Sequence, residues 1–146
     1  MAMVPTASIN MIGFWKEEDD ESSILPIPEA LVGCNCDPVL KDKLLDYLRS
    51  GKVLFEYLGF SHCRFGCGIP EASMGHCTLT DGRWAWPEGL CHYVQEHTVM
   101  LPDEFVIWAN ANEYKVPDIL DMEKVKDSPK SFEYWIEWSR VRMRHK

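Results

Sequence analysis

One stretch decides how the rest of the chain is interpreted. It spans residues 62–105 and has the sequence HCRFGCGIPEASMGHCTLTDGRWAWPEGLCHYVQEHTVMLPDEF. They include four of the six cysteines and four of the five histidines of this 146-residue protein. At their centre, Asp81-Gly82 separates two β-prone segments, and this dipeptide strongly favours a two-residue hairpin turn. We therefore predict an antiparallel hairpin over residues 77–86.

The predicted hairpin has one apolar face and one largely polar face. A two-residue loop pairs Thr80 with Arg83 and Leu79 with Trp84, and residues directly opposite one another share a face of the sheet. The apolar face then carries Cys77, Leu79, Trp84 and Trp86, and the polar face carries Thr78, Thr80, Arg83 and Ala85. Trp84 and Trp86 are interpreted as core residues, with a ligand-stacking face as the alternative.

Helix and strand signals flank the hairpin on both sides. Asp37-Pro38 predicts the start of an amphipathic helix over residues 38–50, because Asp caps free backbone amides and Pro is tolerated in the first turn. The β-branched and aromatic run 53–60 predicts a largely buried strand. Further helices are expected after Pro87, after Pro102 and over residues 129–144. The expected fold is α+β, a small antiparallel sheet packed by three or four helices.

The N-terminal part differs in composition from the remainder of the chain. Residues 17–21 are all acidic, and a run of like charges is typical of solvated loop. We therefore expect residues 1–23 to be a flexible acidic lead-in and residues 24–146 to form a single α+β domain.

The overall composition excludes several classes of protein. The net charge of −8 repels a phosphate backbone, so nucleic-acid binding is not expected. No stretch approaches the roughly 20 apolar residues of a membrane helix, and the N-terminus lacks the basic and apolar segments of a signal peptide. We therefore expect a cytoplasmic protein with no membrane partner, in which clustered cysteines and histidines indicate metal binding or core packing.

Cys63, Cys67, His92 and His97 are the best candidates for metal ligands. Structural zinc sites commonly combine two cysteines from a tight turn with two histidines from a helix. The spacing is wider than in a zinc finger, with 24 residues between Cys67 and His92. The two histidines lie about 140° apart around an ideal helix, so they converge only if the helix frays or tightens at His97. The prediction is a structural zinc; the alternative is no metal, with buried thiols and a hydrogen-bonded histidine.

Other residues offer different chemistry. His62, His76 and Cys91 are substitute ligands, and Cys34 with Cys36 forms a further Cys-x-Cys pair that is more typical of small loop residues. Cys91 adjoins His92 near a helix start and could be a nucleophile, but sequence neighbours on a helix point apart. The enzymatic alternative is a metal-dependent hydrolase that uses the same Cys/His cluster, with an open coordination position and Glu88 as the base.

The segments CRFGCG, LTDGRWAWPEGLCHYV and His97 followed by LPDEFV resemble a family of small, uncharacterised bacterial proteins. The family pattern is Cys-Arg-x-Cys-Gly, then Leu-Thr-Asp-Gly, an aromatic residue, Trp-Pro-Glu-Gly-Leu-x-His-Tyr-Val, a histidine and Leu-Pro. The match covers about 45 residues, and Cys63, Cys67, His92 and His97 occupy positions of the pattern. This chain has one additional residue between the two cysteines, and Cys91 occupies a variable position. The resemblance implies no activity.

Together these patterns predict a small cytosolic binding or interaction module that a structural zinc stabilises. The expected partner is another protein or a second copy of the chain. A basic C-terminus supports this expectation, because it could bind an acidic partner or the acidic run 17–21 of a homodimer. The basic residues are Arg140, Arg142, Arg144, His145 and Lys146.

Overall fold

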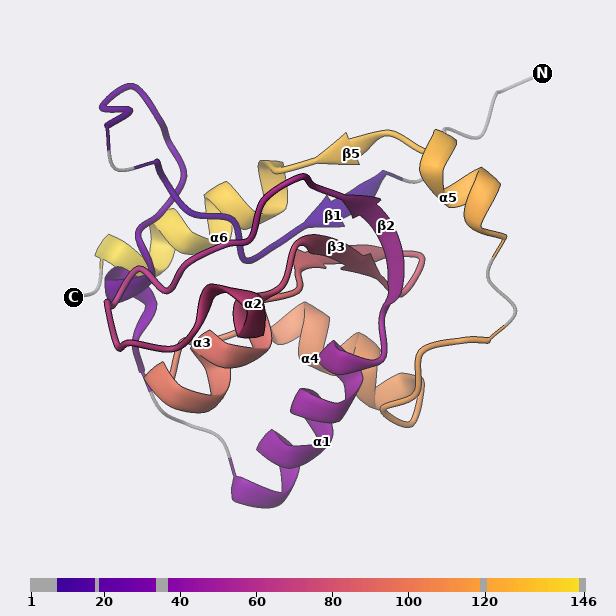
Figure 1. Cartoon of the computed structure of the whole chain (residues 1–146). Helices are drawn as coiled ribbons and strands as arrows, with labels where there is room; N and C mark the ends of the chain where they lie inside the picture. The colour runs from indigo at the N-terminus through magenta and orange to yellow at the C-terminus, as the bar shows by residue number, and fades with distance from the viewer. Residues whose placement is uncertain (1–7, 18, 34–36, 119–120, 145–146) are drawn as a thin grey trace.

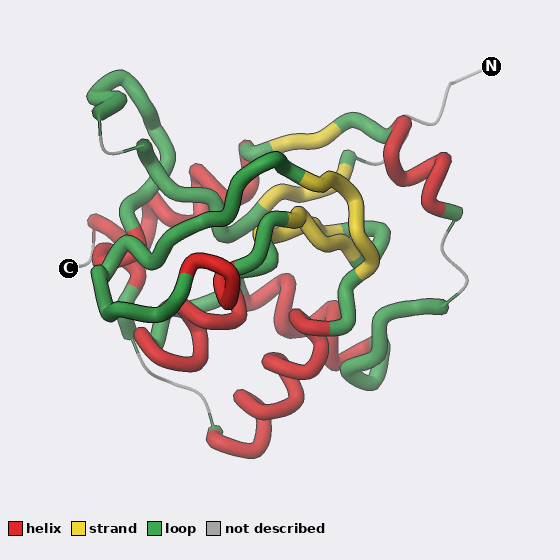
Figure 2. The backbone as a smooth tube through the Cα atoms, in the orientation of Figure 1, coloured by secondary structure: helices red, strands yellow, loops and turns green. Residues whose placement is uncertain are grey.

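The computed structural model describes residues 8–17, 19–33, 37–118 and 121–144. Within these residues, helices surround a five-stranded sheet (Figures 1 and 2). The strands are β1 (Ile9–Met11), β2 (Lys52–Glu56), β3 (Cys77–Thr80), β4 (Trp84–Pro87) and β5 (Lys130–Ser131). The α-helices are α1 (Pro38–Arg49), α2 (Glu71–Met74), α3 (Leu90–His97), α4 (Asp103–Ala111), α5 (Met122–Asp127) and α6 (Glu133–Arg144), and a short 3-10 helix η1 spans Pro28–Leu31. The predicted α+β class is confirmed.

The sheet has the strand order β2-β3-β4-β1-β5 and is mixed. β2, β3 and β4 are antiparallel neighbours, whereas β1 is parallel to both β4 and β5. The prediction of a flexible lead-in over residues 1–23 is therefore wrong for β1, which lies inside the sheet. Ile9, Met11 and Ile12 are at most 3% exposed. Their apolar side chains stabilise the strand, although Glu17, Asp19, Asp20 and Glu21, which follow them, are exposed.

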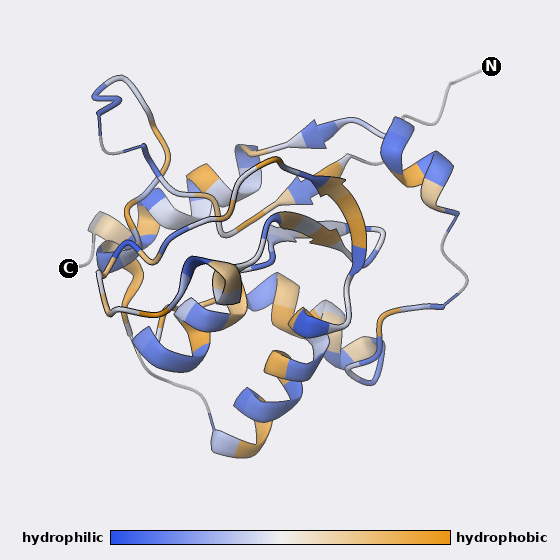
Figure 3. Ribbon diagram, in the orientation of Figure 1, coloured by the Kyte–Doolittle hydropathy of each residue, from blue (hydrophilic) through white to orange (hydrophobic). Residues whose placement is uncertain are grey.

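One face of the sheet carries the main core. Trp84 and Trp86 point into it and are 1% and 0% exposed, and the Trp86 indole Nε1 donates a hydrogen bond to the Leu48 carbonyl at 3.1 Å. The alternative of a ligand-stacking face at these two residues is thus wrong, because helix side chains already cover both rings. The helices contribute large side chains to the same core, and Figure 3 shows hydrophobic and hydrophilic segments alternating along α1.

The 77–86 hairpin is present, but its register is shifted by two residues. Leu79 lies opposite Trp86 and Thr80 opposite Ala85, instead of Trp84 and Arg83. A shift of two preserves the face of every side chain, because side chains alternate along a strand with a period of two. The assignment of Leu79, Trp84 and Trp86 to the core face is therefore right even though the partners are wrong.

The loop is longer than predicted because Asp81 does not form a two-residue turn. The Asp81 Oδ1 accepts hydrogen bonds from the backbone amides of Arg83 at 2.9 Å and Trp84 at 2.7 Å. Its Oδ2 accepts the Tyr47 hydroxyl hydrogen bond at 2.5 Å, and Asp81 is 2% exposed. A type I′ turn needs a positive φ at both central residues, whereas only Gly82 has one, at 96°. The buried hydrogen bonds of the Asp81 side chain thus determine the conformation of the loop.

The opposite face of the hairpin, which was predicted to be largely polar, is also buried. Thr78 and Thr80 are 1% and 0% exposed, and the Thr80 hydroxyl donates to the Trp84 carbonyl at 2.7 Å. A smaller apolar cluster covers this side of the sheet and contains Ile9, Met11, Leu54, Ala85 and Val125. The threonines are tolerated there because their hydroxyls can hydrogen-bond.

β2 lies at an edge of the sheet and is more exposed than predicted. Only Leu54 of this strand is buried, and the segment that follows it is also exposed. The exposed apolar side chains are Val53, Phe55, Tyr57, Leu58 and Phe60. An edge strand packs on fewer neighbours than a central strand, and sequence composition does not distinguish the two.

The C-terminal prediction is partly corrected. Residues 130–131 form β5, and α6 begins at Glu133, so the helix expected over residues 129–144 starts later than predicted. Pro87 belongs to β4, and α3 begins only at Leu90. α5 is a further helix that was not among those expected from the sequence. None of the described helices is long and apolar enough to cross a lipid bilayer.

α1 ends close to the hairpin, and Gly51 makes this approach possible. Asp37 caps the helix as predicted, accepting from the Val39 amide at 3.1 Å, and Ser50 is the C-terminal cap. Gly51 does not have the positive φ that its position after the helix suggested. Instead, a Cβ at Gly51 would lie 2.8 Å from the Leu79 Cβ and 2.8 Å from the Trp86 ring.

Gly51→Ala is expected to lower the free energy of unfolding by about 1–3 kcal/mol, because the added methyl overpacks the contact between α1 and the hairpin. Gly59→Ala is the matched control, since no heavy atom lies within 4 Å of its Cβ position. Urea unfolding of both variants measures the difference. Equal midpoints would contradict the close approach at Gly51.

Candidate metal centre

Cys63 and Cys67 lie on the loop between β2 and α2, in a tight turn. The Gly66 amide donates to the Cys63 carbonyl at 3.0 Å. Gly66 and Gly68 have φ values of 63° and 87°, which glycine adopts without steric cost. The backbone amides of Phe65 and Cys67 lower the pKa of the Cys63 thiol and so favour its thiolate form. This loop therefore turns both thiols toward the same side.

Tyr93 of α3 holds this loop in place, a role that the sequence analysis missed. Its hydroxyl accepts from the Arg64 amide at 2.9 Å and donates to the His62 carbonyl at 3.3 Å. These two bonds are on either side of Cys63 in the sequence. Tyr93 and His97 are four residues apart on α3, so helical spacing alone places them on one face. That spacing is the signal by which Tyr93 could have been found.

α3 supplies His92 near its start and His97 as its last residue. Thr98 follows in the left-handed conformation, with φ 54° and ψ 38°, and ends the helix. The two imidazole rings lie 5.0 Å apart between centroids. The sequence required the helix to fray or tighten at His97 for the two rings to converge, and His97 is the residue at which α3 ends. Phe65 stacks on the His97 ring at 4.1 Å and limits its orientation.

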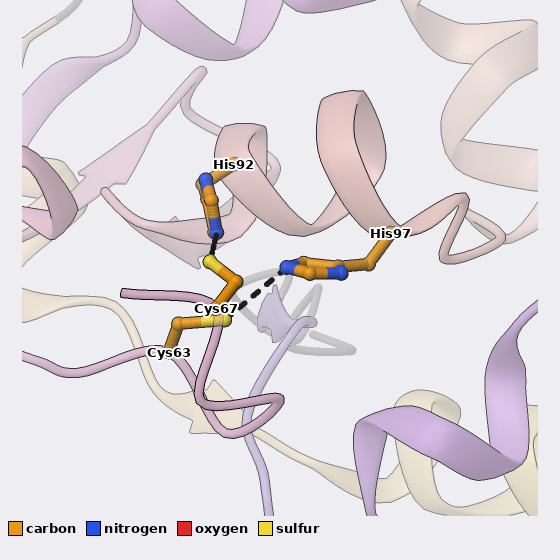
Figure 4. Close-up of side chains that lie close together, drawn as sticks. All are labelled: Cys63, Cys67, His92 and His97. Carbon is orange, nitrogen blue, oxygen red and sulfur yellow. Dashed lines mark hydrogen bonds between the residues drawn. The ribbon is translucent and has the colours of Figure 1, made fainter. Parts of the chain in front are cut away.

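All four predicted ligands converge (Figure 4). The Cys63 Sγ lies 3.3 Å from the His97 Nε2, and the Cys67 Sγ lies 3.4 Å from the His92 Nε2. One donor atom from each residue lies within 4.8 Å of all the others. In a tetrahedral zinc site with Zn–S about 2.3 Å and Zn–N about 2.0–2.1 Å, the sulfur-to-nitrogen distance is about 3.5 Å. The cluster can therefore hold a metal ion.

Burial affects the protonation of the cluster. It raises the pKa of the Cys63 thiol, although the two backbone amides oppose the shift. Burial and the neighbouring His97 lower the pKa of His92, which favours the neutral imidazole that a metal ion requires. Cys67 is exposed, so the cluster is reachable from solvent.

A cavity of about 790 Å³ borders the cluster, and Cys67, His92, His97 and Glu88 line it. Glu88 is not one of the four converging residues. Its Oε1 accepts hydrogen bonds from the backbone amides of His76 at 3.1 Å and Cys77 at 3.2 Å. Glu88 thus has a structural role at the start of β3, in addition to its position at the cavity wall.

The substitute ligands lie elsewhere. The Cys91 Sγ donates to the Leu45 carbonyl at 3.9 Å and belongs to the core, and the His62 carbonyl accepts a hydrogen bond from the Tyr93 hydroxyl. His76 belongs to a second group, formed with Glu56 and Cys77. Burial, Glu88 and Glu56 raise the pKa of the Cys77 thiol. Cys34 and Cys36 lie outside the described residues.

The basic C-terminus pairs with acidic groups of its own chain. Arg140 lies 3.6 Å from Glu137, and Arg142 lies 3.6 Å from Asp103. His145 and Lys146 lie outside the described residues, so the predicted role of this segment as an anchor stays a prediction.

Comparison with known proteins finds no matching family model, and no curated protein or solved structure is significantly similar to this chain. The resemblance to an uncharacterised bacterial family stays a prediction, and the candidate function is argued from the site alone.

Proposed function

We propose that Cys63, Cys67, His92 and His97 bind one structural zinc ion that fastens the loop around Cys63 to α3. The observation that carries this proposal is the approach of four donor atoms to within 4.8 Å of one another. Two thiolates and two imidazoles are a ligand set that zinc prefers in structural sites. The tight turn that carries Cys63 and Cys67 and the end of α3 hold these donors in position before the ion binds.

The complete set of four protein ligands favours a structural role over catalysis. A catalytic zinc keeps one coordination position for water or substrate, and a site with four protein donors leaves none. The adjacent cavity, with Glu88 in its wall, is the observation that favours a metal-dependent hydrolase. Against it, Glu88 is engaged by two backbone amides at the start of β3. We therefore propose a binding module, not an enzyme.

The partner of this module would be a protein, which includes a second copy of the chain. β2 and the segment that follows expose Val53, Phe55, Tyr57, Leu58 and Phe60. Exposed apolar side chains that gather in one segment are typical of interaction surfaces. The segment leads directly into the Cys63 loop, so zinc binding would also order one end of this surface.

Metal analysis of the protein purified without a histidine tag tests the zinc proposal. We expect one tightly held zinc per chain, with sulfur neighbours at about 2.3 Å and nitrogen neighbours at about 2.0–2.1 Å by X-ray absorption. Cys91→Ser is the matched control, because Cys91 lies on α3 but bonds to Leu45, and it should retain the ion. A protein without tightly held metal, or an oxygen-only shell, would overturn the proposal.

A further inference from the structure

We propose that Glu56, His76 and Cys77 form a second site, open to solvent, for a zinc-class divalent cation at the edge of the sheet. One donor atom from each of these residues lies within 4.8 Å of the other two. The three residues share no member with the cluster on α3. The proposal of a second site can therefore be tested independently of the proposed structural zinc.

The β2–β3 pairing and the turn before β3 bring the three donors together. Glu56 and Cys77 are directly opposite partners in the antiparallel ladder, so their side chains share a face. His76 precedes the strand, and its carbonyl accepts from the Tyr57 amide at 2.8 Å. Its ring makes an edge contact with Phe60, with centroids 5.4 Å apart. The backbone and the ring of His76 are thus both held by the segment that follows β2.

Glu88 fixes the two ligands that are adjacent in sequence. Its Oε1 accepts from the amides of both His76 and Cys77, and its own amide donates to the Cys77 carbonyl at 2.8 Å. Gly75 has a φ of 82°, and a Cβ there would collide with the Glu88 carboxylate. A glycine is therefore required next to His76 for this carboxylate to reach both amides. Such outer contacts are what hold ligands in place around a metal.

The charge and the chemistry of the three donors select the class of ion. Glu56 and Glu88 place negative charge beside the Cys77 thiol, which a cation would offset. A thiolate, an imidazole and a carboxylate together suit zinc better than calcium or magnesium, which take oxygen ligands. Three protein ligands leave a fourth position for water or another small ligand. Glu56 is exposed and the other two residues are half-buried, so an ion can enter from solvent.

Metal titration of the intact protein tests this site. After the tightly held zinc has been measured, Co²⁺ is added, and the number of bound equivalents and the thiolate-to-cobalt absorption are followed. We expect one additional equivalent whose absorption corresponds to a single thiolate. Glu56→Gln removes a ligand on the surface without altering the core. It should weaken this equivalent by at least about tenfold, the lower end of what the loss of even an outer-shell partner costs a metal site.

Cys77→Ser and His76→Ala should remove the additional equivalent while the tightly held zinc is retained. Cys91→Ser, which alters a thiol outside both groups, should leave both equivalents unchanged. Circular dichroism confirms that each variant is folded; if Cys77→Ser fails this control, Glu56→Gln decides alone. Absence of an additional equivalent, or an additional equivalent that Glu56→Gln leaves unaffected, would overturn the proposal.

Discussion

Removal of the zinc is expected to lower the melting temperature of the protein by roughly 8–16 °C, at free zinc about 1,000-fold above its Kd, where binding contributes about 4 kcal/mol. The proposed ion would connect the loop around Cys63 to both ends of α3, so its loss would release a loop that packs on the core through Tyr93. The remaining core contains Trp84, Trp86 and Trp135 and does not depend on the ion. We therefore expect a partial loss of stability, not unfolding.

Strong chelation and Cys67→Ser should give the same lowered melting temperature, and chelation of Cys67→Ser should have no further effect. Cys67 is exposed, so this substitution removes a ligand without creating a cavity. Cys91→Ser should respond to chelation as the unmodified protein does. Scanning calorimetry of the three proteins, each with and without chelator, measures these melting temperatures. A melting temperature that chelation does not change would contradict a structural zinc at these residues.

Asp81→Ala is expected to lower the free energy of unfolding by about 3 kcal/mol, since an orphaned buried hydrogen-bonding group costs about 1–3 kcal/mol. The substitution leaves the Tyr47 hydroxyl and the amides of Arg83 and Trp84 without their acceptor. Asp81→Asn is the matched control, because its amide oxygen can accept from both backbone amides and its NH₂ can donate to the Tyr47 hydroxyl. Denaturant unfolding should give a considerably higher free energy of unfolding for Asp81→Asn than for Asp81→Ala.

The same pair of residues predicts a pH dependence. Burial raises the pKa of Asp81 above its usual range, although the Tyr47 hydroxyl and three backbone amides oppose the shift. The folded state therefore holds the proton more tightly than the unfolded state, and stability falls as the pH rises from about 4 through the folded-state pKa. Asp81→Asn lacks this titration, so its stability relative to the unmodified protein should increase over that pH range. A difference in stability between Asp81→Asn and the unmodified protein that does not change with pH would contradict the raised pKa of Asp81.

The face of the sheet to which each hairpin side chain points was predictable from the sequence, whereas the loop that sets the register of the two strands was not. The face of Leu79, Trp84 and Trp86 follows from a period of two, which a shift of two residues leaves unchanged. The register itself depends on Asp81 meeting Tyr47, which lies 34 residues earlier in the chain. Local turn propensity contains no information about such a contact. The exposure of β2 was missed for a related reason, since its neighbours determine whether a strand lies at an edge.

The candidate metal ligands were predictable because residue type and order define a zinc site with little reference to distant contacts. Two thiols in a glycine-rich turn and two histidines on one short helix suffice to propose the cluster. The group of Glu56, His76 and Cys77 was not predictable in this way. Glu56 reaches Cys77 only through the pairing of β2 with β3, and His76 alone had been considered as a ligand.

The position of β1 also determines the order in which the chain can complete its fold. Asn10 pairs with Trp84 on one side and with Ser131 on the other, about 120 residues later. Closing so long a loop adds little to the equilibrium cost, because each doubling of length costs only about 0.6 kcal/mol. During synthesis, however, β5 cannot join the sheet until residues 130–131 have left the ribosome. Before that point, the parallel edge of β1 that β5 later covers would be open to pairing with other chains.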